Sequence, residues 1–333
     1  MRTAVDGHQG GEIVRQGALN LPDLIIHADW SVRARKRCVA RGRRHRGSYL
    51  VSGLDYVGDC GSFVREIEEE VKRTPRTLLG FDFPIGLPRL YATKAGISSF
   101  LELLPNLGST NWPNFFNVAH TPGEVSFGRP FYPNQSRGVL RQDLVGALGL
   151  ERFDDLRRRC EQARPGRRAA CPLFWTLGGN QVGKGAIVGL RDVIIPLLRD
   201  LPGEAWIWPF DGTLNELLQR RGVIVAETYP AEVYSHLDIR LGPGGKRRQD
   251  GRRVASAAIQ NWAARTETNI DELRKEIDDA VGSGASGEDR FDALIGLLGM
   301  INVVLGHRPA MGDLDDPSVV KFEGWILGQT EAC

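Results

Sequence analysis

The first third of the chain alternates between hydrophobic and polar residues as β-strands do, and then changes to a helical period. Three segments rich in β-forming residues follow one another, separated by short basic or glycine-containing turns. Next comes a segment whose apolar residues are three and four apart, and a continuous apolar run that Pro84 ends. The pattern predicts strands at 24–32, 36–42 and 47–57, a helix at 62–73 and a buried strand at 77–85.

The middle of the chain loses this periodicity and recovers it after residue 203. A stretch rich in proline and aromatic residues, NWPNFFNVAHTPGEVSFGRPFYPNQSRG, indicates an irregular loop inside an insertion. Further elements are predicted as helices at 140–162 and 186–200, strands at 204–210 and 223–230, a long helical region at 251–280 and an apolar helix at 289–305. The resulting division is a flexible extension (1–21), a core (22–88 and 204–310), an inserted subdomain (89–203) and a C-terminal tail (311–333).

Carboxylates stand where the apolar pattern predicts burial. Asp29, Asp82 and Glu227 lie in or at the ends of strand-like apolar runs, where an unpaired charge is costly. Asp289 and Asp292 are three residues apart at the start of an apolar helix, so they share one face. Converging carboxylates without His or Cys ligands suit a hard cation such as Mg²⁺ or Mn²⁺. The pattern therefore predicts a two-metal phosphodiesterase site, in which Asp29 bridges the ions.

Each of these residues also has a purely structural interpretation. Asp289 would cap its helix, and Asp82 would hold the turn before Pro84. Glu288 is a further candidate ligand or a solvated acid of the first helical turn. His27 shares a strand face with Asp29, either as an acid–base group or as a packed, hydrogen-bonded histidine.

The segments DFPIGLP, ETYPAEVY and DRFDALIGLL resemble a family of predicted nucleases in the ribonuclease H-like superfamily, catalogued as domain of unknown function 429. The order of elements, β-β-β-α-β, insertion, β and helices, is similar to that fold. The resemblance implies Asp29 and Asp82 as metal ligands on strands, and Asp289 and Asp292 as metal ligands on a helix. Glu227 matches the Glu-x-x-Pro segment of the family and is a candidate catalytic residue. The family implies a chemistry rather than a particular substrate.

Basic residues gather in three short segments although the net charge is only +2. Local patches of this kind attract polyanions. Lys246, Arg252 and Arg253 follow the Glu227 strand by some twenty residues, as basic residues do in the resembled family, and are predicted to bind the substrate phosphate. Solvated surface charge is the alternative. The segments 33–46, 157–168 and 246–253 hold eight, six and five Lys or Arg residues.

A glycine-rich segment at 178–185, GGNQVGKG, offers a rival interpretation. It follows an apolar run and precedes an apolar helix, as a phosphate-binding P-loop does. Gly185 stands where such a loop needs a hydroxyl for Mg²⁺, and no apolar strand ending in Asp follows. The segment favours Lys184 as a phosphate contact, or plain turn glycines, over an ATP-hydrolysing loop.

The aromatic residues of the inserted loop also have two interpretations. They would stack on unpaired bases or attach a long loop to the core, and the second is the commoner role for aromatics near prolines. They are Trp112, Phe115, Phe116, Phe131 and Tyr132.

Composition narrows the class of protein. Hydrophobic residues make up 41% of the 333 residues and charged residues 25%, as in ordinary globular proteins. The five cysteines show no Cys-x-x-Cys spacing, which disfavours a zinc site and a disulfide framework. No apolar run is long enough to span a bilayer, and the first residues lack the apolar core of a signal peptide. A cytoplasmic protein is expected.

The sequence thus predicts an α/β protein of ribonuclease H-like fold, a mixed sheet flanked by helices with a large inserted subdomain. Its predicted function is Mg²⁺- or Mn²⁺-dependent hydrolysis of nucleic acid, with DNA and RNA both open. The alternatives are a non-catalytic nucleic-acid- or nucleotide-binding protein of the same fold and a P-loop-like ATP-dependent enzyme. The nuclease hypothesis requires the carboxylates to converge on one cleft with basic segments beside it.

Overall fold

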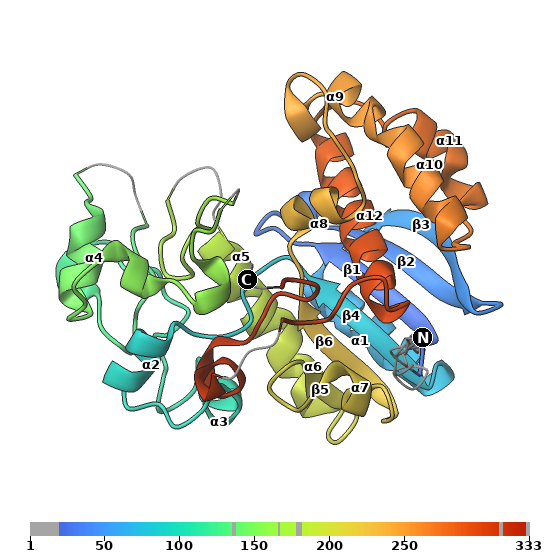
Figure 1. The fold of residues 1–333 in the computed structure, drawn as a ribbon. Helices are drawn as coiled ribbons and strands as arrows, with labels where there is room; N and C mark the ends of the chain where they lie inside the picture. The colour runs from blue at the N-terminus through green and yellow to red at the C-terminus, as the bar shows by residue number, and fades with distance from the viewer. Residues whose placement is uncertain (1–19, 135–137, 166, 178–181, 313–315, 331–333) are drawn as a thin grey trace, which may run out of the picture.

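The core of the protein is one mixed six-stranded sheet with helices on both faces (Figure 1). The computed structural model describes residues 20–134, 138–165, 167–177, 182–312 and 316–330, so most of the expected extension at 1–21 lies outside the described residues. The strand order is β3-β2-β1-β4-β6-β5, with β1, β4, β6 and β5 parallel and β2 antiparallel to its neighbours. The strands are β1 (Leu24–Asp29), β2 (Cys38–His45), β3 (Ser48–Tyr56), β4 (Arg76–Phe81), β5 (Ala205–Ile207) and β6 (Gly222–Glu227).

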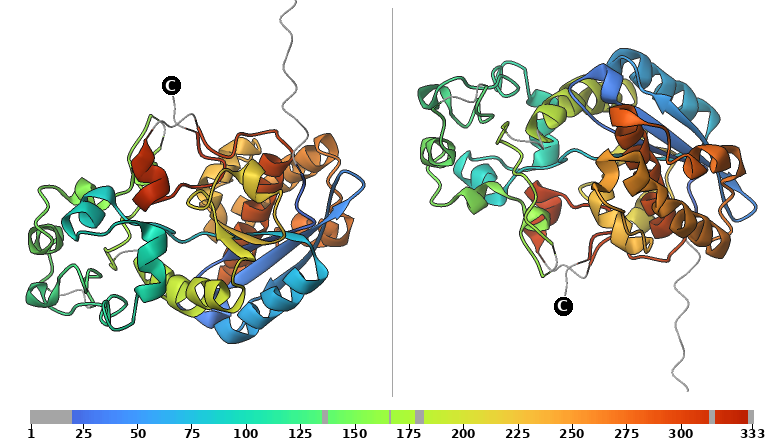
Figure 2. Two further views of the ribbon diagram at one scale, coloured as in Figure 1. Left: turned by 90° about the horizontal axis from the view of Figure 1, so that it is seen from below. Right: turned by 90° about the horizontal axis from the view of Figure 1, so that it is seen from above.

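The alternation of side chains along β1 divides the core into two layers. Ile26 and Ala28 face one hydrophobic layer, which α1 (Cys60–Arg73) covers together with one long helical segment. That segment comprises α5 (Val182–Gly189), a π-helical turn (Leu190–Ile194) and α6 (Ile195–Asp200). Ile25 faces the other layer, which α8 (Pro230–His236), α10 (Ala255–Arg265) and α12 (Gly284–Val304) cover. Figure 2 shows the two layers on opposite sides of the sheet.

The prediction of a helix at 140–162 is wrong beyond the first two turns of that segment. Helix α4 spans only Arg141–Ala147, and Gly149 takes a left-handed φ of 60° that ends it. The helix predicted at 186–200 is present and longer. Pro196 has no amide hydrogen to donate, and the helix accommodates it just after the π-helical turn.

The helical region predicted at 251–280 is divided into short pieces. Helix α10 is preceded by α9 (Gln249–Arg253) and followed by α11 (Arg274–Asp278). Glu267, between α10 and α11, has a positive φ of 54°, which no helix interior permits. The break turns the chain so that these helices pack beside α12 instead of extending into solvent (Figure 1).

The inserted region consists of short helices and irregular segments beside the sheet (Figure 1). Its helices are α2 (Arg89–Lys94), α3 (Phe100–Leu103) and α4, whereas α7 (Leu214–Leu217) follows β5. Phe115, Phe131 and Tyr132 are completely buried and Phe116 nearly so, so these four hold the loop together and are not exposed to stack on bases, whereas Trp112 is half-buried. Residues 182–200, expected within the insertion, pack against α1 as part of the core.

The C-terminal segment is part of the core, contrary to the expected tail at 311–333. Trp325 and Ile326 are buried, and the amide of Leu327 donates to the carbonyl of Glu227 at 2.8 Å. A π-helical turn (Val319–Glu323) precedes them beside α2 and α3. No helix in the described residues combines the length and the apolar character that a membrane span needs.

A buried histidine fastens α12 to β1. His27 Nδ1 lies 3.0 Å from the carbonyl oxygen of Ala293 on α12. Nε2 lies 2.8 Å from Oγ1 of Thr228, the residue directly after β6. The pKa of His27 is lowered to about 4 by burial, so the ring is neutral at pH 7. Gly296 lets the helix approach, because a Cβ there would lie 2.1 Å from the ring. His27 is therefore a packed histidine and not an acid–base group.

We expect Gly296→Ala to destabilise the protein by about 1–3 kcal/mol, because the helix must move away from the His27 ring. Gly146→Ala is the matched control. It lies in α4 with nothing within 4 Å of the added Cβ, so it should be neutral or stabilising by up to about 1 kcal/mol. Urea unfolding measures both, and equal effects would contradict the close approach.

Candidate functional site

The carboxyl ends of two neighbouring parallel strands bring two aspartates together. Asp29 ends β1 and Asp82 follows β4, and the pairing of Ala28 with Phe81 places the two aspartates side by side. The Trp30 amide donates to Asp82 Oδ1 at 2.6 Å and fixes that carboxylate. The parallel register of β1 and β4 therefore places these two acids together at one edge of the sheet.

Helix α12 adds two further carboxylates from the side. Tyr234 donates its hydroxyl to Asp292 Oδ1 at 2.7 Å, and the Lys246 ammonium forms an ion pair with Oδ2. Lys36 Nζ lies 3.8 Å from Asp289 Oδ1. Two of the four carboxylates thus have a lysine partner. No ion pair in the described part of the chain involves the other two, Asp29 and Asp82.

Four carboxylates form an acidic cluster: Asp29, Asp82, Asp289 and Asp292. Burial raises the pKa of each of them, and repulsion within the cluster adds to the shift of Asp29, Asp82 and Asp289. Burial raises the pKa of Asp29 well above its usual range, and the charges of the other three members raise it further. Burial raises the pKa of Asp82 to about 7, although the bond from Trp30 opposes the shift. Asp82 also shares a hydrogen bond with Asp29. Without a cation, the pair therefore retains a proton near neutral pH.

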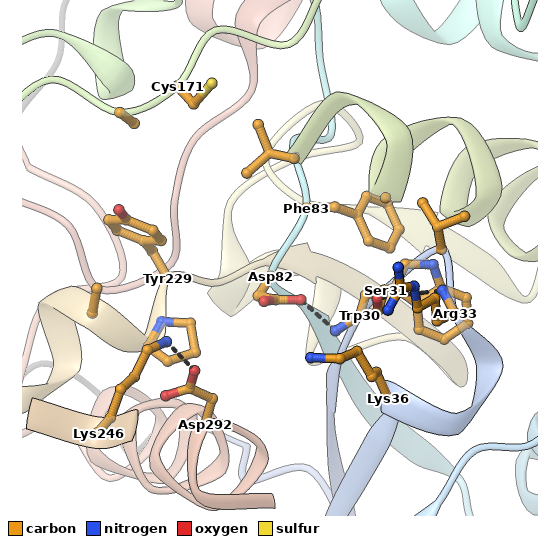
Figure 3. A pocket seen from close by; sticks show the side chains of 16 residues that line it. Trp30, Ser31, Arg33, Lys36, Asp82, Phe83, Cys171, Tyr229, Lys246 and Asp292 are labelled. Atoms are coloured by element: carbon orange, nitrogen blue, oxygen red, sulfur yellow. Dashed lines mark hydrogen bonds and ion pairs between the residues drawn. The ribbon is translucent and has the colours of Figure 1, made fainter. Parts of the chain in front are cut away.

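The cluster opens into a cavity of about 550 Å³ (Figure 3). Asp82 and Asp292 line the cavity together with Lys36, Lys246 and Arg33. Figure 3 shows Lys36 and Lys246 on either side of the two aspartates, with Cys171 of the inserted region across the space. The remaining lining comes from the loop after β1, from Phe83, from the start of α8 and from α5.

Glu227 lies outside this cluster. Its two oxygens each accept a hydrogen bond of 2.6 Å from Arg158, and Oε2 also accepts one of 2.7 Å from the Ile85 amide. Arg158 is fully buried and also bonds Glu161. Glu227 ends its strand as expected, but it is the anion of a structural ion pair. Removing one partner of such a pair costs about 3–5 kcal/mol.

The basic residues predicted to bind substrate differ in their position relative to the cavity. Lys246 lines the cavity. Arg252 does not bind substrate: it is 1% exposed, and its guanidinium donates to the carbonyls of Ala280, Lys246 and Gly282. Its role is to hold the loop that carries Lys246.

Two further predicted contacts lie away from the cavity lining. Arg253 is exposed and pairs with Asp250 at 3.3 Å, as a solvated surface arginine does. Lys184 lies on α5, whose Val182 and Gly185 line the cavity while Lys184 does not.

Most other arginines of the basic segments are structural. On β2, Arg41 pairs with Asp55 and Glu66, and Arg43 pairs with Glu70. In the segment 157–168, Arg158 is buried, and four further arginines bond carbonyls or acids: Arg157, Arg159, Arg164 and Arg167. Of the described residues in the three basic segments, Arg33, Lys36 and Lys246 line the cavity beside the acidic cluster, where the nuclease hypothesis places basic residues.

The glycine-rich segment lacks the setting of a P-loop. Residues 178–181 lie outside the described residues, so the loop itself is not described. The preceding apolar run at 172–177 forms a turn and one isolated bridge instead of a strand. A P-loop needs a strand on that side, because the strand orients the loop toward the phosphates.

Several cavity residues carried little signal in the sequence. Trp30 and Tyr229 are neighbours of the acidic motifs in sequence, and Lys36 belongs to a basic segment. Tyr234 was not predicted, because its bond to Asp292 joins α8 to α12 across 58 residues. Within the described residues, no group of three or more His, Cys, Asp or Glu side chains is already arranged to hold a metal ion.

Comparison with known proteins adds no relative: no family model, no curated protein and no solved structure matches the chain. The family resemblance, the metal and the substrate therefore rest on the residues of this chain alone.

The raised pKa of Asp82 predicts a pH-dependent stability. In the unfolded chain Asp82 loses its proton near pH 4, but in the folded protein it does so only near pH 7. Folding is therefore penalised increasingly as the pH rises from about 4 to about 7. We expect Asp82→Asn to be more stable than the wild type at pH 8, by on the order of 1–3 kcal/mol, with the difference lost near pH 4.

Urea unfolding at the two pH values, in chelator, measures this difference. Asp250→Asn is the control, because that carboxylate is exposed on α9 and far from the cluster in the chain. An Asp82→Asn effect that is the same at both pH values would contradict the raised pKa of Asp82.

Proposed function

We propose that the chain is a Mg²⁺- or Mn²⁺-dependent nuclease of the ribonuclease H-like superfamily, related to the family catalogued as domain of unknown function 429. The observation that carries the proposal is the acidic cluster: two strand aspartates facing two helix aspartates, beside a cavity lined by Arg33, Lys36 and Lys246. The topology supports it. Three antiparallel strands, a helix and a strand parallel to the first are followed by a late helix that returns acids to the first strand.

The residues present fit a divalent cation. The cluster has four carboxylates, two paired lysines and no His or Cys donor, which suits a hard ion bound by oxygen. Asp29 and Asp82 would supply the first ligands, because they lack an ion-pair partner in the described residues. Asp292 would join once Lys246 leaves it. A divalent ion in this site would lower the pKa of a bound water, which makes that water a better nucleophile, and would supply a counter-charge for the leaving oxygen.

The cations around the cavity have the role of holding the phosphate. Arg33, Lys36 and Lys246 line the cavity (Figure 3), and the two lysines pair with acids of the cluster. A guanidinium and two ammonium groups neutralise a phosphodiester through charge-assisted hydrogen bonds. The Trp30 amide and the Tyr234 hydroxyl hold Asp82 and Asp292 in place, so neither carboxylate has to reorganise as charge develops.

Lys246 has two competing partners in this proposal. In the structure its ammonium binds Asp292 and lies 3.7 Å from Glu288, so it occupies an oxygen that the ion needs. This competition would account for the finding that, within the described residues, no group of three or more acids is already arranged to hold a metal ion. Binding of the ion would release Lys246 toward the phosphate, which couples metal binding to substrate binding.

We expect Asp29→Asn to abolish both Mn²⁺-dependent cleavage and the thermal stabilisation by Mn²⁺, since it removes ligand charge at nearly constant volume. Glu227→Gln is the matched comparison. It should lower stability because Arg158 loses its partner, yet retain the stabilisation by Mn²⁺. Thermal unfolding with and without Mn²⁺ measures both. The reverse pattern would make Glu227 a ligand and remove Asp29 from the site.

Lys246→Met should bind Mn²⁺ more tightly than the wild type, because the competing ammonium is gone, and should bind an oligonucleotide more weakly. Isothermal titration calorimetry with Mn²⁺ and fluorescence anisotropy with a labelled oligonucleotide measure the two changes. Lys72→Met, on the exposed face of α1, is the control. Weaker binding of both ligands would show a merely structural lysine. Oligonucleotide binding without any cleavage would favour the non-catalytic binding protein.

A further inference from the structure

The cavity above the acidic cluster is enclosed by parts of the chain that are far apart in sequence. One wall is the loop after β1, including Trp30 and Arg33, and another is the start of α8 with Tyr229. Ala170 and Cys171 of the inserted region also line the cavity, and Cys171 lies across it from Asp82 and Asp292 (Figure 3). Asp82 and Asp292 therefore lie in a concave pocket and not on a flat surface.

The arginines that flank Ala170 and Cys171 anchor this wall to the core. Arg157 donates to the Ala170 carbonyl at 2.7 Å, and the Ala170 amide donates to the Glu161 carbonyl at 2.8 Å. Arg158 holds the same segment to Glu227 at the end of β6 through its fully buried guanidinium.

A second anchor lies on the other side of the wall. Arg167 forms an ion pair with Glu232 of α8, and its guanidinium lies 5.7 Å from the centre of the Tyr229 ring. The segment 157–168, which the sequence offered as a nucleic-acid contact, thus holds one wall of the pocket against the other. Widening the pocket would break the half-buried ion pair between Arg167 and Glu232.

The size of this pocket restricts the substrate. A volume of about 550 Å³ is that of a site for one small ligand. A B-form duplex, whose major groove alone is about 12 Å wide, presents its phosphates on a broad stiff surface and cannot enter a pocket of this size. We propose that the site takes an unpaired nucleotide, at a strand end or in a single-stranded segment, and excludes duplex. The proposal rests on the proposed function and names its substrate class.

The chemistry of the walls agrees with an unpaired nucleotide. Tyr229 is half-buried and presents an aromatic side chain to the cavity, and a base can stack on such a ring irrespective of its identity. Arg33 and Lys36 line the cavity and would bind one phosphate, and Lys246 would join them once a bound ion releases it from Asp292. One aromatic face with a few cations and carboxylates matches one nucleotide rather than a helical surface.

The test compares a labelled 12-nucleotide single strand with the blunt duplex of the same sequence, by fluorescence anisotropy at one ionic strength. The full chain is used with Ca²⁺, an oxygen-seeking ion, as the probe metal. The single strand is expected to bind at least 10-fold more tightly than the duplex. Equal or tighter binding of the duplex, or binding of neither, overturns the proposal.

Tyr229→Leu should weaken single-strand binding by about 5- to 150-fold, the worth of one stacked base, and leave duplex binding unchanged. Tyr56→Leu is the control, because Tyr56 is exposed and does not line the cavity. An equal loss for both oligonucleotides overturns the assignment of Tyr229.

Thiol labelling gives a readout on the unmodified protein. Cys171 lines the cavity and is half-buried, whereas the half-buried Cys60 lies outside the lining and serves as the internal reference. The single strand should slow labelling of Cys171 relative to Cys60, and the duplex should not. Unchanged labelling with the single strand overturns the proposal.

Failure of this proposal and failure of the nuclease function are distinguishable. Metal-dependent cleavage of blunt duplex in its interior would overturn the substrate class and leave the nuclease standing. Selective binding of the single strand without any cleavage would overturn the nuclease and leave the selectivity of the pocket standing.

Discussion

Repulsion among four carboxylates at one edge of the sheet is the constraint on which the site depends. Asp29 and Asp82 are adjacent because β1 and β4 are parallel neighbours, and α12 brings two more acids against them. Such an arrangement is unfavourable in a low-dielectric setting unless the packing around it forces it. His27 and Gly296 supply that packing, since they fix α12 on β1 at a separation that admits no added Cβ. The close packing of α12 on β1 at His27 and Gly296 thus keeps the repelling carboxylates near one another.

A second group of charged residues, around Arg158, lies outside the acidic cluster and holds parts of the fold together. Arg158 joins the inserted region to Glu227 of β6 and to the C-terminal segment through the Glu323 carbonyl. The group is fully satisfied by hydrogen bonds and closed to solvent, whereas the acidic cluster is short of cations and opens into a cavity. Acids at the ends of neighbouring strands therefore have different surroundings. Glu227 at the end of β6 is paired with Arg158, whereas Asp82, directly after β4, has no ion-pair partner in the described residues.

The local pattern predicted much of the core but less of its boundaries. Alternation and apolar runs gave β1 to β4, α1 and α12, because burial on one or both faces leaves a period in the sequence. The helix predicted at 140–162 ended at Ala147, since a left-handed glycine overrode helical propensity. The C-terminal residues were expected to be a tail, because pairing with β6 through Glu227 and Ile326 is a contact across 99 residues and leaves no local signal.

The sequence by itself determined which carboxylates are placed at strand ends and on a helix face, because those positions follow from local periodicity. It also determined that the acidic side chains of these motifs are carboxylates, whose only donor atoms are oxygens. Only the tertiary structure decided which acids meet one another and which meet an arginine. Asp82 and Glu227 have the same signature, an acid closing an apolar strand, yet Arg158 reaches only Glu227. Arg252 and Lys246 are both basic residues of one segment, but one is buried among carbonyls and the other faces the cavity. Long-range packing makes that choice, because charges acquire their role from the partners that the fold brings within hydrogen-bonding distance.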